Sequence, residues 1–360
     1  MVTVELQPAP DTLDPANRLV VEWSELAAHT HAIPFLRPGW IGAWWRAFGT
    51  GVPMLLVLHR RGRLSGVAPL LRCGSVLHGA CNWHTPEFGL LAETRADRDR
   101  LSAALFEQRP RRVSLGFLSA EEDLERLRTA ATSVGYDVLV RTLADSPWID
   151  LRAGLRSYDA GLERNGPRNV RRGLRRLRAL GRVSLDVEEG AERLPELLMD
   201  AFRLEALAWK GEQGTAIASR PDTRLFYREV AAWAAAEGML RLALLRLDGR
   251  MIAFQLGIEH RGVHYALKGG YDPEYAHCSP GILVLHATLV DAFERRLERY
   301  ELLAGSEGYK LQWANRTRPL RLLQAFARTM LGRLDRSAYA YGRPLARAAG
   351  LHRALGRVAR

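Results

Sequence analysis

The chain has 360 residues, of which 47% are hydrophobic and 26% charged, and its formal net charge is +12. This composition is typical of a globular protein with a large buried core, and the length suggests two domains or two fused halves. No apolar run approaches the ~18 residues of a membrane span and no export signal opens the chain, so we expect a cytoplasmic protein. Three scattered cysteines exclude a disulfide framework and a paired-cysteine zinc site, and we expect no metal.

The positive charge is concentrated in two segments. Residues 164–182 hold eight arginines and no acid, and residues 318–360 hold ten arginines and one aspartate. Such segments suit anionic ligands (coenzyme phosphates, nucleic acid or acidic lipid), although a solvated helix face would look the same. Only Lys210, Lys268 and Lys310 are lysines among 52 basic residues, which suggests that a compact point charge matters there.

The first half, residues 1–152, begins with an expected extended piece at 18–22 and helices at 23–29 and 39–48. A hairpin follows at 53–71, with its turn at 61–62. His84 and Glu87 then lie in a polar loop that either lines a substrate cleft or is internally satisfied. The remaining pattern predicts a helix at 97–107, a strand at 112–117, a helix at 121–133 and a strand at 137–141.

The second half, residues 153–320, repeats this plan. The pattern predicts an arginine-rich helix after residue 164, a strand at 183–187, and helices at 194–209 and 223–237. The hairpin 239–258 matches 53–71 at an offset of 187, which places its turn at 248–249. An internal repeat of a whole α/β unit is the simplest account. Trp209 and Lys210 lie where the second helix gives way to a glycine-containing loop.

A strand, turn and helix follow at residues 265–297. Leu267–Gly270 ends the strand, Ser279 is an expected N-cap, and Pro280 suits the first helical position. Gly281 leaves bare backbone N–H groups in the first turn, and such a helix start can hold a phosphate or pyrophosphate. It can equally be an ordinary capped helix. Residues 321–360 predict a basic tail of one or two amphipathic helices, which either packs on the body or lies on an anionic membrane surface.

The order of elements does not alternate strand and helix throughout, which argues against a doubly wound nucleotide fold. It resembles the GNAT acyltransferase superfamily, and more narrowly its FemAB-like and CelD-type (cellulose biosynthesis) branch. The residues that carry the resemblance are RNVRRGLRRLRALG, EALAWKGEQG, ALKGGYDPEYAHCSPGILVLHATL and LLAGSEGYKLQWA. The resemblance implies an α/β (α+β) class with tandem GNAT-like folds, in which mixed central sheets are flanked by helices.

The resemblance also implies where an acyl-CoA co-substrate binds. Its pyrophosphate would lie at the turn of Ser279, Pro280, Gly281 and Ile282. The strand end Leu267, Lys268, Gly269 and Gly270 would bind the pantetheine arm and polarise the thioester carbonyl through a backbone N–H. The usual glycine-rich phosphate loop is not matched, because His277–Ile282 holds one glycine. The resemblance therefore supports the fold better than it supports acyl-CoA as the donor.

The resemblance further implies an N-acyltransferase (acetyltransferase-like) that uses direct attack by an amine. The acceptor would be an amino sugar, amino acid or polysaccharide precursor, bound near His84, Glu87, Trp209 and Lys210. Bases and acids for this chemistry would be Glu259, His264, Glu307, Tyr271 and Tyr309, with Lys310 orienting a carboxylate or phosphate. Two alternatives stay open: transfer of an aminoacyl group from transfer RNA, and a non-catalytic binding or assembly protein on the same fold.

Overall fold

The structure is a computed structural model, and it describes residues 2–10, 13–162, 165–207, 220–305 and 308–342. The chain forms two compact units that are not contiguous in sequence. Unit 1 comprises residues 1–32, 49–143 and 321–360, and unit 2 comprises residues 33–48 and 144–320. Residues 33–48 therefore belong with the second half of the chain, and residues from 321 onward belong with the first.

Unit 1 is a mixed sheet with helices in contact with it. Its strands follow the order β1-β2-β3-β4-β6-β13; neighbours are antiparallel except β4 and β6, which are parallel, and β5 pairs with β3. The elements are β1 (Val2–Pro8), α1 (Arg18–His29), β2 (Val52–Arg60), β3 (Arg63–Cys73), β4 (Val76–Gly79), β5 (Leu91–Ala92), α3 (Arg95–Glu107), β6 (Arg112–Leu118), α4 (Glu121–Ser133), the start of β7 (Tyr136–Asp150), the end of β13 (Arg316–Ala327), α12 (Met330–Ser337) and the π-helical η4 (Ala338–Gly342).

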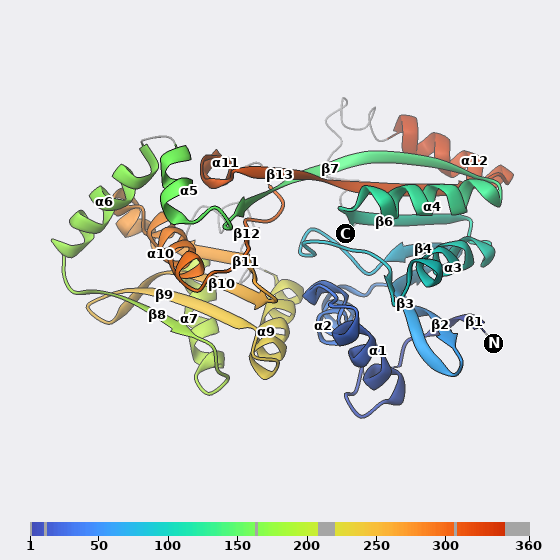
Figure 1. The fold of residues 1–360 in the computed structure, drawn as a ribbon, viewed down its shortest axis with the longest axis horizontal. Helices are drawn as coiled ribbons and strands as arrows, with labels where there is room; N and C mark the ends of the chain where they lie inside the picture. The colour runs from blue at the N-terminus through green and yellow to red at the C-terminus, as the bar shows by residue number, and fades with distance from the viewer. Residues whose placement is uncertain (1, 11–12, 163–164, 208–219, 306–307, 343–360) are drawn as a thin grey trace. The chain divides into compact units, whose positions relative to one another are not determined.

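Unit 2 has the same plan. Its strands follow the order β8-β9-β10-β11-β12-β7, again antiparallel except for the parallel pair β11 and β12. In Figure 1, α10 and α6 lie on one face of this sheet and α7 and α9 on the other. The elements are η1 (Pro34–Leu36), α2 (Pro38–Phe48), the end of β7, α5 (Leu155–Gly161), α6 (Asn165–Arg178), β8 (Val183–Glu188), α7 (Leu194–Leu207), α9 (Pro221–Ala236), β9 (Leu240–Leu247), β10 (Arg250–His260), β11 (Val263–Tyr271), η3 (Pro273–Cys278), α10 (Pro280–Glu294), β12 (Arg299–Glu301), α11 (Gly308–Trp313) and the start of β13.

Backbone conformation confirms the internal repeat at the offset of 187. The hairpin turns 61–62 and 248–249 both place their two residues at positive φ, as a two-residue type I′ turn requires. Arg109 and Arg296, which follow α3 and α10, are also left-handed, with φ of 53° and 58°. Each pair is separated by 187 residues, and α3 and α10 occupy the same place in their sheets, between the two parallel strands.

Two expectations about secondary structure were wrong, and two strands were predicted incompletely or not at all. Residues 18–22 are helical, because the Asn17 side chain accepts from the Leu19 N–H and starts α1 at Arg18. Residues 321–327 belong to strand β13, whose nearly continuous burial hides the alternation that would have marked a strand. The strand expected at 137–141 extends to Asp150, and the strand β1 was not predicted.

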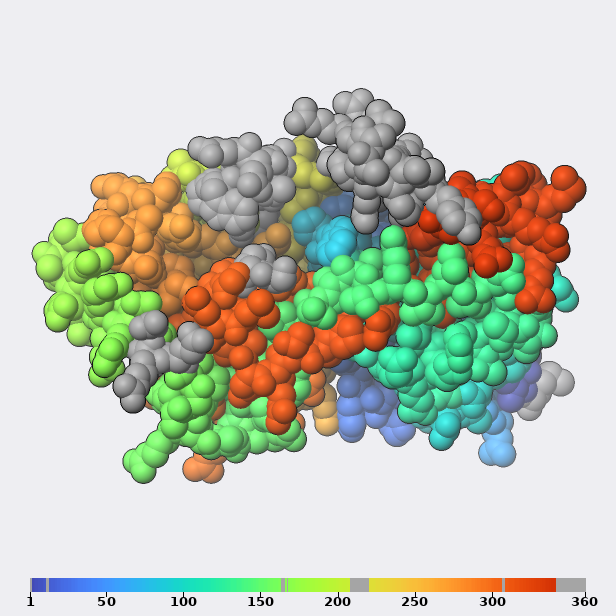
Figure 2. Space-filling view, turned by 90° about the horizontal axis from the view of Figure 1, so that it is seen from above, coloured from blue at the N-terminus to red at the C-terminus, as the bar shows by residue number. Residues whose placement is uncertain are grey.

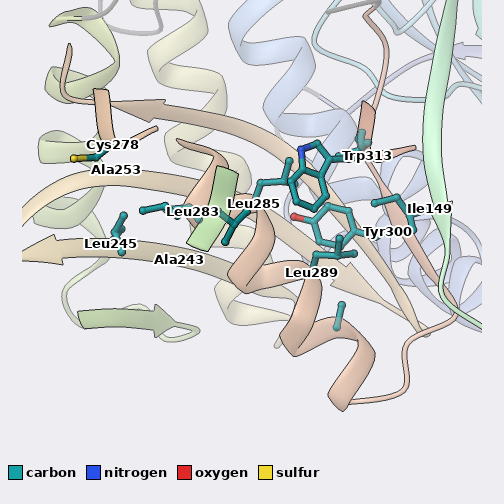
Figure 3. Packing of buried hydrophobic residues seen from close by; sticks show 14 of the residues in the cluster. Ile149, Ala243, Leu245, Ala253, Cys278, Leu283, Leu285, Leu289, Tyr300 and Trp313 are labelled. Carbon is teal, nitrogen blue, oxygen red and sulfur yellow. The ribbon is translucent and has the colours of Figure 1, made fainter. Parts of the chain in front are cut away.

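Unit 2 holds its core between α10 and the sheet. Leu283, Leu285 and Leu289 of α10 are buried against β9 and β10, and Tyr300 and Trp313 complete the cluster. Figure 3 shows this cluster along α10, from the start of the helix to Tyr300 and Trp313. Burial of several large side chains, each worth roughly 1.5–3 kcal/mol, fixes α10 on the sheet and so fixes where the helix begins.

Candidate functional site

The start of α10 has no side-chain cap. Ser279 adopts the left-handed conformation (φ 55°, ψ 49°), and its hydroxyl makes no capping hydrogen bond, so the expectation that this hydroxyl caps the helix was wrong. The Ser279 carbonyl instead accepts from the N–H groups of Ile282 (3.0 Å) and Leu283 (3.1 Å). Pro280 has no N–H, and the N–H of Gly281 lies in the first turn, where the helix offers no acceptor.

The end of β11 lies against this helix start. A Cβ atom built on Gly281 would be 3.2 Å from Cδ1 of Tyr271, the last residue of β11. The tyrosine ring therefore lies beside the first turn of α10. The structure thus brings together the two segments that the sequence assigned to the acyl donor, Leu267–Gly270 with its neighbour Tyr271 and the turn Ser279–Ile282.

Strand β11 continues beyond its parallel partner. Strand β12 pairs with β11 only over residues 263–265, whereas β10 pairs with β11 as far as Tyr271. The edge of residues 266–271 that would face β12 is therefore outside the ladder. A register shift opposite Leu256 and Gly257 also leaves Leu267 as the extra residue of a β-bulge. This divergence of two parallel strands is the splayed strand end that the resemblance implied.

Three polar side chains gather beneath the end of β11. Glu205 of α7 is 0% exposed, and its Cα would be 3.0 Å from a Cβ atom on Gly270. Burial and the charge of Glu205 raise the pKa of Tyr227 well above 10. The Lys268 ammonium lies 5.3 Å from the centroid of the Tyr227 ring. A carboxylate, a phenol and an ammonium thus lie close to the diverging strands.

Sequence reasoning did not single out Glu205 or Tyr227. Glu205 lies four residues after Ala201 on the buried face of α7, which also carries Leu197 and Leu198. A carboxylate on the apolar face of a helix is costly to bury and is the signal that would have drawn attention to it.

The arginine-rich helix α6 packs on the turn that precedes α10. A Cβ atom on Gly173 would lie 2.4 Å from the carbonyl oxygen of Cys278, so only glycine permits this approach. Nη1 of Arg176 donates to the carbonyl oxygen of His277 at 3.0 Å. Figure 2 shows the yellow-green surface of α6 next to the orange surface of the η3–α10 segment.

His264 lies near the start of β11, and Glu259 lies opposite it near the end of β10. They pair with each other next to the β10–β11 turn, whereas Gly269 is five residues further along, roughly 16 Å at ~3.3 Å per residue. Burial raises the pKa of Glu259, but hydrogen bonds from Arg295 (2.7 Å each) and the charge of Arg241 outweigh it and hold the pKa below 4.5. His264 lies two residues before Ala266, where β11 is no longer paired with β12, and Glu259 is the cross-strand partner of His264.

His264 is a buried side chain. The side chain is 3% exposed and stacks on Tyr300 with ring centroids 4.5 Å apart. Burial lowers the pKa of His264 to about 4. His264 is therefore a neutral, packed side chain at physiological pH.

The other predicted site residues lie on α11, in unit 1 or outside the described ranges. On α11, Tyr309 is 44% exposed, and Nζ of Lys310 donates to the Ala304 carbonyl at 3.0 Å. In unit 1, Glu87 accepts a hydrogen bond from the Ser119 hydroxyl.

Four further predictions fall elsewhere. The His84 N–H donates to Asn82 Oδ1 at 2.9 Å, also in unit 1. Trp209, Lys210 and Glu307 lie outside the described residues.

The equivalent helix of unit 1 begins differently. Oγ1 of Thr94 accepts from the Asp97 N–H (3.1 Å) and donates to the Asp97 carboxylate (2.7 Å). Asp97 is 0% exposed and is also bound by Arg60. A carboxylate therefore already occupies the start of α3. Of the two equivalent helices, α10 is the one whose start is open to an anion.

The described part of the chain contains no cluster of three or more histidine, cysteine, aspartate or glutamate side chains arranged to hold a metal. None of the helices that the structure describes is both long and apolar enough to span a bilayer.

The fold is shared with several solved structures at low sequence identity. FemX aligns with a TM-score of 0.59 and 12% identity, over 89% of this chain and 96% of FemX. The C-terminal domain of a protein described as a lysylphosphatidylglycerol synthetase from Agrobacterium fabrum gives 0.56 and 12%, over 85% and 90%. A conserved protein of unknown function from Bacteroides thetaiotaomicron gives 0.55 and 11%, over 90% and 100%.

Comparison of sequences gives one family match. No curated protein sequence matches the chain. Residues 164–311 match the family model described as acetyltransferase (GNAT) domain, and this range contains α6, the diverging end of β11 and the start of α10. Residues 164–311, less than half of the chain, are therefore similar to a GNAT acetyltransferase domain, and this similarity supports an enzyme of the acyltransferase type.

Proposed function

We propose that the protein transfers an acyl group from acyl-CoA to an amine. The observation that carries this proposal is the uncapped start of α10 beside the open edge of β11. The pyrophosphate would bind the first turn at Gly281, where the helix dipole and a bare N–H favour a negative charge. The pantetheine arm would follow residues 267–270, as an added strand follows a sheet edge.

The chemistry then requires few side chains. The amine nitrogen attacks the thioester carbon, a base takes the proton of the amine, and the C–S bond breaks to leave a thiolate that is protonated. A backbone N–H of the β11 edge would stabilise the developing oxyanion. Glu205, whose Cα would lie 3.0 Å from a Cβ atom on Gly270, is our candidate base, and Tyr271 is our candidate acid. The acceptor class we propose is an amino sugar, amino acid or polysaccharide precursor, as in the CelD-type branch.

A second candidate is transfer of an aminoacyl group from RNA. The observation that favours it is the surface of α6, where Arg168, Arg171, Arg172, Arg175, Arg176 and Arg178 are all exposed. A run of cations of this kind suits a phosphodiester backbone, and its binding would weaken steeply with salt.

The test is binding followed by turnover. Thermal unfolding is measured with coenzyme A, acetyl-CoA, a long-chain acyl-CoA and a short single-stranded RNA. Acetyl-CoA at a hundredfold excess over its Kd should raise stability by about 2.7 kcal/mol. Release of free thiol on addition of an amine, abolished by Glu205→Gln, would support both donor and base. Stabilisation by the RNA and by no coenzyme would replace the proposal with the second candidate.

A further inference from the structure

We propose that Arg172 and Arg176 form a second anion site, which binds the 3′-phosphate of the coenzyme A donor. The inference rests on the proposed function, because it assigns the far end of the same donor. It differs from the pyrophosphate assignment, since it concerns side chains of α6 rather than the start of α10.

The position of the two arginines is fixed by close packing. At 100° per residue, Arg176 lies about 60° and Arg172 about 100° from Gly173, the residue that touches the Cys278 carbonyl. Arg176 also donates to the His277 carbonyl at 3.0 Å. Both residues therefore lie on the same side of the contact with the turn, whereas Arg171 and Arg175 are about 160° from Gly173 on the opposite face.

These guanidinium groups are not neutralised by carboxylates. Within the described ranges, no carboxylate forms an ion pair with Arg172 or Arg176, and Arg172 donates to the Asn169 side chain. Elsewhere in unit 2, Arg241 and Arg295 each bind acidic side chains. Like charges four residues apart destabilise an isolated helix, so the pair Arg172 and Arg176 is unfavourable unless an anion joins it.

A phosphomonoester fits this pair. It carries nearly two negative charges near pH 7 and three acceptor oxygens, and the planar guanidinium group binds such oxygens in a bidentate manner. A guanidinium has five N–H donors, and the His277 carbonyl accepts from one nitrogen of Arg176. The guanidinium group of Arg176 lies beside the turn where the pyrophosphate would bind, and Arg172 lies about one helical turn before Arg176.

The experiment compares coenzyme A with 3′-dephospho-coenzyme A by calorimetry, using the full chain. The wild type should bind coenzyme A at least tenfold more tightly. The double variant Arg172→Gln/Arg176→Gln should lose this preference while still binding the dephospho form. The matched control Arg171→Gln/Arg175→Gln removes the same charge from the opposite face and should retain the preference. Arg172→Gln alone, which leaves the His277 contact intact, should weaken it.

Three results would overturn the inference. A wild type that binds both coenzymes equally has no such site. An equal loss of the preference for coenzyme A in the two double variants would indicate a diffuse electrostatic field and not a defined site. An unchanged preference in Arg172→Gln/Arg176→Gln would place the 3′-phosphate elsewhere while leaving the proposed function standing. Failure of the wild type to bind either coenzyme would instead remove the proposed function itself.

Discussion

Gly281→Glu should abolish donor binding without unfolding the protein. Gly281 is not at positive φ, and the added Cβ atom meets only the flexible Tyr271 ring within 3.4 Å. Relief of that 3.2 Å contact costs on the order of 1 kcal/mol, as for a strained side-chain rotamer. Replacing a glycine within a helix stabilises the folded state by up to ~1 kcal/mol, and a carboxylate near the helix start stabilises it by a further ~0.3–1 kcal/mol. The free variant should therefore match the parent within about 1 kcal/mol.

The affinity for the donor should change far more than the stability of the free protein. A carboxylate ~4 Å from a pyrophosphate charge repels it by about 4 kcal/mol at an effective dielectric constant of ~20. Since 1.4 kcal/mol is a tenfold change in affinity, the variant should lose at least a hundredfold. The stabilisation of about 2.7 kcal/mol expected for the wild type at a hundredfold excess of acetyl-CoA should then vanish.

The assay is denaturant unfolding with and without acetyl-CoA. Gly281→Gln is the matched control, because it adds nearly the same volume without charge. We expect Gly281→Gln to keep part of the ligand-induced stabilisation and Gly281→Glu to keep none. Wild-type stabilisation by acetyl-CoA that persists in Gly281→Glu would refute the placement of the pyrophosphate at α10.

Three further predictions concern unit 2. Gly173→Ala should lower the free energy of unfolding by about 1–3 kcal/mol although alanine favours a helix, because its Cβ would lie 2.4 Å from the Cys278 carbonyl oxygen. The control Gly161→Ala, which has open space around it, should leave the thermal stability unchanged. Burial lowers the pKa of His264 from 6.5 to about 4. Between these pH values the unfolded chain binds a proton at His264 that the folded chain does not bind. The free energy of unfolding should therefore fall by up to about 3 kcal/mol as the pH drops from 6.5 to about 4. A pH series of chemical denaturation should show this slope, and His264→Phe should remove it. Glu259→Gln should lower stability by about 1–3 kcal/mol with turnover unchanged, since two arginines already hold the carboxylate in ion pairs. A matching loss of kcat would make Glu259 catalytic after all.

The parts of the fold that the sequence predicted are those that depend on residues close together in the chain. The hairpins 53–71 and 239–258 carry a glycine in a two-residue turn, and their shared offset revealed the duplication. The start of α10 was also predictable, because proline and glycine mark it by residue type. These signals need no knowledge of distant parts of the chain.

What the sequence could not supply depends on tertiary context. The left-handed conformation of Ser279 was not visible, because serine ordinarily caps a helix with its hydroxyl. The buried position of Glu205 depends on how α7 packs on β11. How far Glu259 and His264 lie from the open strand edge depends on where β11 leaves β12, and a strand pattern does not encode that position.

The assignment of residues from 321 onward to unit 1 has a consequence for synthesis on the ribosome. Strand β6 is an edge of the unit 1 sheet until residues 321–326 arrive to pair with it. At ~5–20 residues per second, the intervening chain takes roughly 10–40 s to emerge, and during this time unit 2 can complete its own core first. An unpaired strand edge invites association with other chains. A nascent chain halted before residue 321 is thus expected to need chaperone protection that the finished chain does not.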